Sequence, residues 1–217
     1  MKLDPNDFVI TRRRKKYKFA HFANLDNCFE LSEWKFPSTD QPVTVELGAG
    51  TALFAVELAA RHPERLYIAI DVKADRLQKG AREAVARGID NVLFVRSRAD
   101  QLAEVCPEGS IDELWLTFSD PFPKKRAAKH RLTHPRFLDI YRLILNPGGR
   151  LLVKHDNPTF FHWSLEQLVK YNWRIDELSF DLHDSDLSDD YKVMTTYEAR
   201  WVGEGAIIGF VRARYTA

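Results

Sequence analysis

A carboxylate, two prolines and a basic run occur together in the segment FSDPFPKKRAAKHRL, residues 118–132. Pro121 and Pro123 fix the backbone and exclude a helix or a central strand. Asp120 is therefore expected at the end of the element that residues 111–118 form. Five Lys or Arg residues and His130 follow within residues 124–131. Such a cluster is suited to contact with the phosphates of a polyanion.

A glycine-containing turn forms the second candidate site. Residues 46–52 read ELGAGTA, and glycines at such a turn let the backbone bend tightly and approach a ligand. Asp71 follows Gly50 by 21 residues, a spacing at which an acid can accept hydrogen bonds from ribose hydroxyls. Ala52 stands where a dinucleotide fingerprint has its third glycine. The pattern thus indicates an adenosine-containing cofactor and favours S-adenosylmethionine, which carries no phosphate.

Alternating strands and helices are predicted to position these two motifs. Seven strands are expected, at residues 43–47, 65–71, 91–95, 111–118, 150–156, 173–182 and 206–215, with helices at 51–63, 73–88, 101–105, 134–145 and 157–172. This alternation is typical of a parallel α/β sheet with helices on both faces. In that architecture ligands bind at the carboxyl ends of the strands, where the winding direction reverses. Both motifs fall at those ends.

The length of 217 residues suits a single core. We expect a basic, partly irregular N-terminal extension over residues 1–40 and one domain over residues 41–217. No apolar run approaches the roughly 20 residues that span a bilayer, and no apolar segment follows the charged start as in a secretory signal, so a cytoplasmic protein is predicted. Cys28 and Cys106 have no metal-site spacing, and no metal is expected.

The net charge of +1 conceals an uneven distribution of charge. Residues 11–18 include six basic side chains and residues 124–131 five, whereas residues 175–190 contain seven acids and no Lys or Arg. Each cluster taken alone fits a solvated surface. Two separated basic clusters together fit a protein that binds nucleic acid.

Five segments occur here in the same order as in the bacterial tRNA (guanine-N7-)-methyltransferases, which this sequence closely resembles: residues 46–50, Asp71, residues 118–132, KHDN at 154–157 and MTTYEARW at 194–201. The resemblance covers roughly Val43 to the C-terminus, and S-D-P-x-P-K-K-R and T-x-Y-E are its most specific parts. It implies a class I, Rossmann-like, seven-stranded doubly wound methyltransferase domain. It further implies that S-adenosylmethionine is used to methylate nitrogen 7 of the variable-loop guanosine conventionally numbered 46 in tRNA.

The resemblance also implies roles for individual residues. The cofactor would be held by Glu46, Gly48, Gly50, Asp71, Arg98 and Asp120, the guanosine by Lys124, Asp156, Thr195, Thr196, Tyr197 and Glu198, and further RNA by Arg126, Lys129, His130 and Arg131. Nitrogen 7 of guanine has a free lone pair and needs no deprotonation, so positioning should carry most of the catalysis. Asp120, as the catalytic residue, could stabilise the cationic purine, while Asp156 and Glu198 could accept hydrogen bonds from guanine.

The sequence departs from the family at Ala52 and at Arg98, which stands where an acid commonly lies near the adenine; Asp100 could serve instead. Three other interpretations stay open. They are a methyltransferase that acts on an exocyclic amine, a noncatalytic RNA-binding protein on this fold, and a nicotinamide oxidoreductase. The Lys-Lys-Arg continuation at residues 124–126 and T-x-Y-E disfavour the exocyclic-amine methyltransferase. The intact cofactor turn disfavours the noncatalytic protein, and Ala52 disfavours the oxidoreductase.

Overall fold

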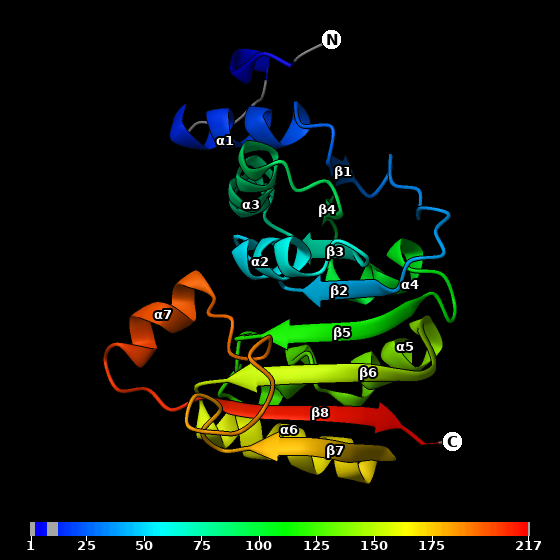
Figure 1. The fold of residues 1–217 in the computed structure, drawn as a ribbon, viewed down its shortest axis with the longest axis vertical. Helices are drawn as coiled ribbons and strands as arrows, with labels where there is room; N and C mark the ends of the chain where they lie inside the picture. The colour runs from blue at the N-terminus through cyan, green and yellow to red at the C-terminus, as the bar shows by residue number, and fades with distance from the viewer. Residues whose placement is uncertain (1–2, 8–12, 217) are drawn as a thin grey trace.

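The computed structural model describes residues 3–7 and 13–216. Their core is a sheet in the order β1-β4-β3-β2-β5-β6-β8-β7 (Figure 1). The strands are β1 (Cys28–Glu30), β2 (Val43–Leu47), β3 (Leu66–Asp71), β4 (Val92–Arg96), β5 (Ile111–Thr117), β6 (Leu145–His155), β7 (Trp173–Ser179) and β8 (Gly209–Tyr215). Strands β1 to β6 pair in parallel, whereas β8 runs antiparallel to both β6 and β7.

Helices cover both faces of this sheet, as the strand–helix alternation predicts. The helices are α1 (Arg13–Ala23), α2 (Leu53–Arg61), α3 (Ala74–Arg87), α4 (Leu102–Val105), α5 (Pro135–Ile144), α6 (Pro158–Lys170) and α7 (Thr196–Val202), with 3-10 turns η1 (Pro5–Asp7), η2 (Ala99–Gln101) and η3 (Lys125–His130). One apolar core lies beneath α4, α5 and α6, and the other beneath α1, α2 and α3. No helix in the described part of the chain is long and apolar enough to cross a membrane.

The sheet has eight strands in the described part of the chain, so the expectation of seven is one too few. The additional strand, β1, pairs in parallel with β4 at the edge of the sheet. It has three half-buried residues, too few to show the apolar periodicity from which a strand is predicted. Helix α1, which the sequence patterns also do not predict, lies beside α3. Both elements fall within residues 1–40.

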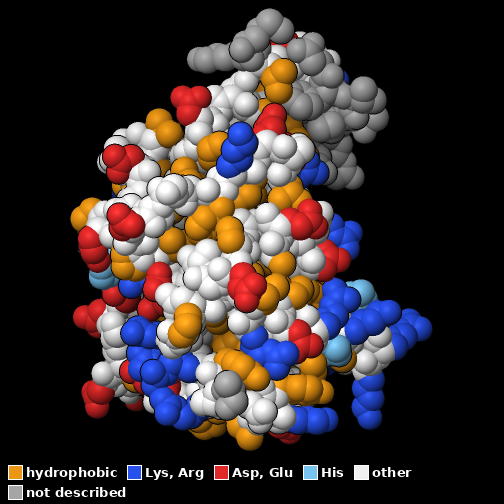
Figure 2. Space-filling model, turned by 90° about the vertical axis from the view of Figure 1, so that its right-hand side faces the viewer, with side chains coloured by type: hydrophobic (Ala, Val, Ile, Leu, Met, Phe, Trp, Pro, Cys, Tyr) orange, Lys and Arg blue, Asp and Glu red, His pale blue; other side chains and the backbone are white. Residues whose placement is uncertain are grey.

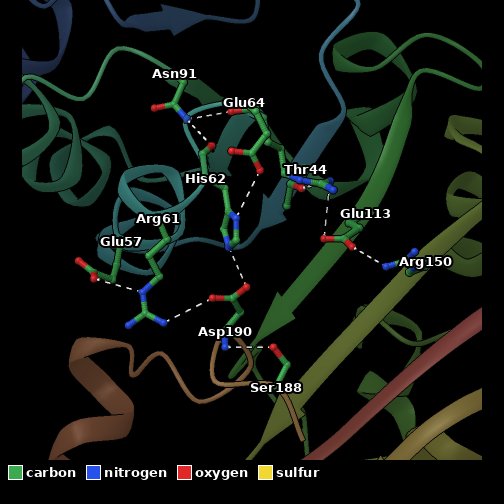
Figure 3. A network of polar contacts seen from close by, with 11 residues as sticks. Thr44, Glu57, Arg61, His62, Glu64, Asn91, Glu113, Arg150, Ser188 and Asp190 are labelled. Carbon is green, nitrogen blue, oxygen red and sulfur yellow. Dashed lines mark hydrogen bonds and ion pairs between the residues drawn. The ribbon is translucent and has the colours of Figure 1, made fainter.

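The acidic segment between β7 and α7 folds across the sheet rather than projecting into solvent (Figure 1). Asp190 lies in its second half, and the Asp190 carboxylate is 2.7 Å from His62 Nε2 and 3.4 Å from Arg61 at the end of α2. Glu57 and Glu64 extend this network on the other side of the two bases (Figure 3). The Asp190 carboxylate therefore ties this segment to the end of α2, because it pairs with Arg61 and contacts His62.

Candidate active site

The glycine turn follows β2 and is bonded to the next strand. The backbone nitrogens of Gly48 and Ala49 both donate to Ile70 O, at 2.8 and 3.0 Å. Gly48 and Gly50 have φ values of 76° and 56°, in the left-handed region that favours glycine. The Gly50 nitrogen donates to Asp71 Oδ2 at 2.9 Å. The two parts of the predicted cofactor motif thus meet in space.

Asp71 ends β3 with its carboxylate held by the backbone. Oδ2 accepts from Gly50, and Oδ1 accepts from the Lys73 nitrogen at 2.8 Å. A carboxylate offers about four lone-pair directions, so this one can still accept hydrogen bonds from two hydroxyls. The geometry fits the predicted contact with a ribose.

Helix α3 packs closely against the glycine turn through Gly80, a residue that the sequence patterns do not single out. A Cβ at Gly80 would lie 2.5 Å from Thr51 O and 3.1 Å from Ala52. Ala52 itself has a φ of 56° and is buried. The close helix contact that a third glycine would provide is therefore made from α3. The position of Gly80 in the middle of a predicted helix is the sequence signal that could have indicated this close contact.

Glu46 lies beneath the turn and does not line the cavity that opens at the carboxyl ends of β2 to β5. Its Oε1 accepts from Thr117 Oγ1 at 2.7 Å, and its Oε2 accepts from the Ala55 nitrogen at 3.2 Å. Burial raises the pKa of Glu46 to about 7, because a low-dielectric site disfavours the charged form. A buried acid here ties β2, β5 and the start of α2 to one another.

A cavity of about 390 Å³ opens at the carboxyl ends of β2, β3, β4 and β5. In Figure 1 the arrowheads of β2 and β5 mark this edge of the sheet. The predicted cofactor residues that line the cavity are Gly48, Asp71, Arg98 and Asp120. This is the point at which the winding reverses, because α2 and α5 cover opposite faces.

Arg98 and Asp100 form one unit at the rim of the cavity. Arg98 Nε and Nη2 donate to the two Asp100 oxygens at 2.9 and 2.8 Å. This hydrogen bonding lowers the pKa of Asp100 below its ordinary value. Both alternatives left open for the adenine contact are thus at the cavity, and they are paired with each other.

The elbow, which we define as residues 118–123, has an unusual backbone. Phe118 and Phe122 have φ values of 52° and 41°, and such conformations in bulky residues cost on the order of 1–2 kcal/mol each. Asp120 between them is exposed and lines the cavity. Ser119 also lines it, and its Oγ is buried with no hydrogen-bond partner among the described residues. The cavity therefore provides an unsatisfied polar atom and an acid, both of which suit a polar, cationic cofactor.

Two residues predicted to bind guanosine lie together beside this elbow. Tyr197 Oη donates to Asp156 Oδ2 at 3.0 Å, and the Tyr197 ring lies 5.4 Å from the Phe118 ring. His155, whose Nδ1 lies 3.2 Å from Asp156 Oδ1, and then the hydrogen bond from Tyr197 hold the pKa of Asp156 below its ordinary value. Asp156 is thus an anion positioned between β6 and α7.

Glu198, in contrast, faces no open space in this structure. It is completely buried, with Oε2 bonded to Lys154 Nζ at 2.8 Å and Oε1 3.0 Å from His183 Nε2. Oε2 also accepts from the Thr195 nitrogen, while Thr195 Oγ1 accepts from the Glu198 nitrogen, so the pair caps α7. In T-x-Y-E, the Thr and Glu therefore build the helix that carries Tyr197. The side chain of Thr196 lies outside the described residues.

The basic run after the elbow forms η3, and most of its side chains are exposed. The exposed residues are Lys124, Lys125, Arg126, Lys129 and His130. Arg131 differs, because it is only 8% exposed, donates to Phe122 O and lies over the Trp163 ring at 4.4 Å. Lys and Arg side chains are also unevenly spread over the face in Figure 2, where they gather in groups.

Part of the N-terminal basic cluster lies outside the described residues. Arg12 is not among them, and the side chains of residues 13–15 are likewise not described. Lys16 and Lys18 belong to α1, where Lys18 is exposed. The prediction that residues 12–18 contact RNA therefore stays a prediction.

Solved methyltransferase structures share this fold. The 16S rRNA methyltransferase KamB superposes with a TM-score of 0.63 at 16% identity, covering 85% of this chain and 96% of that chain. The 16S rRNA (adenine(1408)-N(1))-methyltransferase from Catenulisporales acidiphilia superposes with a TM-score of 0.60 at 20% identity, covering 100% of this chain and 95% of that one. The predicted class I methyltransferase fold is confirmed.

Sequence comparison identifies the family. The Methyltransf_4 family model, described as "Putative methyltransferase", matches residues 40–209. A tRNA (guanine-N(7)-)-methyltransferase of Cytophaga hutchinsonii is 33% identical, covering 94% of this chain and 98% of that protein. One of Brevibacillus brevis is 38% identical, with coverages of 87% and 89%. The resemblance carried by the elbow and by T-x-Y-E is thus confirmed, and the chain belongs to the tRNA (guanine-N7-)-methyltransferase family.

Proposed function

We propose that this protein transfers a methyl group from S-adenosylmethionine to nitrogen 7 of a guanosine in tRNA, at the variable-loop position conventionally numbered 46. One hydrogen bond carries the proposal: His155 Nε2 lies 2.7 Å from Ser119 O. Asp120 and Asp156 directly follow the two bonded residues in the sequence. The cofactor cavity and the Asp156–Tyr197 pair therefore adjoin at one edge of the sheet.

The cofactor would be held by groups that suit a sulfonium-containing adenosine. Asp71 would accept from the ribose hydroxyls, while Gly48 and Gly50 allow the backbone to approach the ligand. Ser119 Oγ, which is buried without a partner among the described residues, would bond to a polar atom of the ligand. When bound, S-adenosylmethionine supplies an electrophilic methyl group. Glu46 would act from below, by holding the turn.

The acids of the site suit a reaction that makes the purine cationic. Nitrogen 7 attacks through its own lone pair, so the protein needs no general base there. Asp120, exposed at the cavity, would stabilise the positive charge as it develops. Asp156 would accept hydrogen bonds from the ring N–H and amino group of guanine. Tyr197, 47% exposed and next to Phe118, offers an aromatic face for the base.

The remaining predicted contacts concern the RNA backbone. Lys124 adjoins the elbow, and three exposed residues of η3, Arg126, Lys129 and His130, follow it. They would draw phosphates toward the edge that carries Asp120. Glu198 and Thr195 would contribute by holding α7, and Arg131 by holding the elbow.

Nucleoside analysis of tRNA tests the proposed function. A tRNA transcript with guanosine at position 46 is incubated with the protein and S-adenosylmethionine, digested and analysed, and a second sample is treated with borohydride and aniline. We expect 7-methylguanosine and chain scission at that position alone. A transcript with adenosine at position 46 is the matched control and should gain no methyl group. Methylation of an exocyclic amine or a ribose would contradict the proposal.

A further inference from the structure

Two buried residues bind backbone carbonyls of the elbow. His155, at the end of β6, lies with Nε2 2.7 Å from Ser119 O. Arg131, directly after η3, donates from Nη2 and Nε to Phe122 O at 3.0 and 3.3 Å. The two side chains are only 4% and 8% exposed. Asp120 lies in the short stretch of chain between the two carbonyl groups that they bind.

The surroundings of His155 determine that Nε2 carries a proton. Nδ1 lies 2.9 Å from the backbone nitrogen of Asn157, which donates to it when the ring is neutral, and 3.2 Å from Asp156 Oδ1, to which it would donate when the ring is charged. Nε2 is protonated in both cases. The remaining tautomer would place a lone pair against the oxygen of Ser119. His155 is therefore a donor to the elbow in either charge state.

Among the described residues, few other hydrogen bonds hold the shape of the elbow. Pro121 and Pro123 have no N–H to donate, and Phe118 and Phe122 have the positive φ values that a free chain avoids. The Phe118 nitrogen donates to Lys154 O at 3.0 Å and fixes the start of the segment. Beyond that point, the bonds from His155 and Arg131 to backbone carbonyls oppose relaxation of the strained backbone.

Arg131 is itself held by packing. Its guanidinium lies 4.4 Å from the centre of the Trp163 ring on α6, a cation–π contact that favours this orientation. The last cation of the basic run is thus directed into the protein, while Lys129 and His130 before it are exposed. The Arg131 guanidinium therefore binds the elbow and is not exposed to solvent.

We propose that His155 and Arg131 are positioning residues, which set the Asp120 carboxylate at the cofactor cavity by clamping the carbonyls of Ser119 and Phe122. The proposal rests on the proposed function, in which Asp120 acts on the reacting purine. Neither clamp residue touches the substrate. Loss of a clamp should lower turnover, because a misplacement of about 1 Å can cost roughly a hundredfold. It should weaken cofactor binding much less, because Asp71 and the glycine turn still hold the ligand.

Two substitutions of His155 separate clamping from packing. In His155→Gln the amide nitrogen takes the place of Nε2 and can still donate to Ser119. In His155→Asn the amide oxygen takes the place of Nδ1, so the bond to Asn157 is kept while the elbow bond is removed. We expect His155→Asn to lower kcat by about 30- to 100-fold, and His155→Gln to stay within about threefold of wild type. The matched control is His21→Asn on α1, with unchanged turnover.

The measurement is transfer of tritiated methyl groups to tRNA at saturating cofactor and RNA, with the dissociation constant of S-adenosylmethionine determined in parallel. Equal losses in the Asn and Gln variants would overturn the clamp, and so would a loss of cofactor affinity that matches the loss of turnover. If His155→Asn does not fold, Arg131→Met and Arg131→Lys provide a second pair, of which the Lys variant keeps one donor and should keep the greater turnover. Equal turnover in that pair would also reject the proposal.

A double-mutant comparison ties the effect to Asp120. If the clamp acts through this carboxylate, His155→Asn should cost little in an Asp120→Asn background, and the two losses should not multiply. Full multiplication would contradict the proposal. The wild-type nucleoside product decides the proposed function separately, because the clamp is judged from relative rates for whichever methyl transfer the wild type performs.

Discussion

Lys154 Nζ and Glu198 Oε2 lie 2.8 Å apart, and neither side chain is accessible to solvent. Nζ also donates to the backbone oxygens of Val193 and Tyr191, at 2.6 and 3.2 Å, which uses all three of its donors. Burial lowers the pKa of Lys154, and the neighbouring Glu198 carboxylate opposes that effect. This ion pair joins the last turn of the acidic segment and the start of α7 to β6, one residue before His155.

Lys154→Met should destabilise the protein by about 3–5 kcal/mol, because it leaves the Glu198 carboxylate buried without its cation. Adding Glu198→Gln should restore part of this loss. Denaturant unfolding measures both. The control is Arg200→Met, which removes an exposed ion pair with Glu204 and should cost less than about 1 kcal/mol. A loss no larger than that of the control would show that the buried pair contributes little.

Glu46 should make stability depend on pH between about 5 and 8. Its folded pKa of about 7 lies above the unfolded value of about 4.5, so the folded state binds the proton more tightly. The resulting stability is present below the unfolded pKa and is lost as pH rises through the folded pKa. As pH rises from 5 to 8, ionisation of Glu46 should lower the free energy of unfolding by on the order of 2 kcal/mol. Glu46→Gln, which cannot ionise, should lack this decrease, and parallel pH profiles would contradict the assignment.

Gly80→Ala should weaken the binding of S-adenosylmethionine by about tenfold or more. Its Cβ would lie 2.5 Å from Thr51 O, a contact with backbone that can be relieved only by moving the glycine turn or α3. The control is Gly88→Ala at the end of the same helix, where φ is +65° and no heavy atom lies within 4 Å of the new Cβ. That change should cost stability of about 1 kcal/mol and leave cofactor affinity unchanged. Calorimetric titration compares the two.

The central strands and the cofactor motif could be predicted because local patterns encode them. The residues of β2 are all buried, and Val43, Val45 and Leu47 at every second position, directly before the glycine turn, mark this strand in the sequence. Gly50 and Asp71 are at a spacing set by one strand–helix–strand unit. Edge strand β1 has no such pattern, since only one of its sides is paired and its three residues are half-buried.

Local patterns could not predict which residues of each motif make structural contacts and which face the candidate site. Arg131 is one of five similar cations in its run, and its bonds to Phe122 O and its contact with Trp163, 32 positions away, distinguish it. The sequence around Glu198 suggests an acid available to a ligand. In the structure its carboxylate is instead bonded to Lys154, 44 positions away. The sequence around His155 is that of an ordinary core or surface histidine, and its bond to Ser119 spans 36 positions. Contacts over such separations depend on how the sheet assembles.

Removing the exposed cations of η3 should reduce the salt dependence of tRNA binding. The triple variant Lys125→Ala, Arg126→Ala, Lys129→Ala should flatten the slope of log affinity against log salt by about two to three units, roughly one for each phosphate that is no longer neutralised. The matched control replaces Arg142, Arg150 and Arg174, which pair with acids in the structure. The control slope should not change. Equal slopes in the two variants would assign η3 to an ordinary solvated surface.

Asp120 is the residue on which the chemistry should depend most. It follows β5 at the cavity, is exposed, and lies between the carbonyls that His155 and Arg131 bind. Asp120→Asn keeps the size of the side chain and removes its charge. We expect it to lower the methylation rate by about a hundredfold or more, as loss of one preorganised electrostatic contact can do, while tRNA affinity stays largely intact.

The expected loss should appear in kcat, because the carboxylate acts on charge that develops only as nitrogen 7 is alkylated. Single-turnover methylation with saturating S-adenosylmethionine and tRNA measures it directly, and a filter-binding assay measures affinity for the RNA. Asp139→Asn on α5, an exposed acid paired with Arg142, is the matched control and should turn over at the wild-type rate. If Asp120→Asn also turned over at the wild-type rate, Asp120 would have no part in the mechanism. The assignments of cofactor and tRNA would not be affected, because other experiments test them.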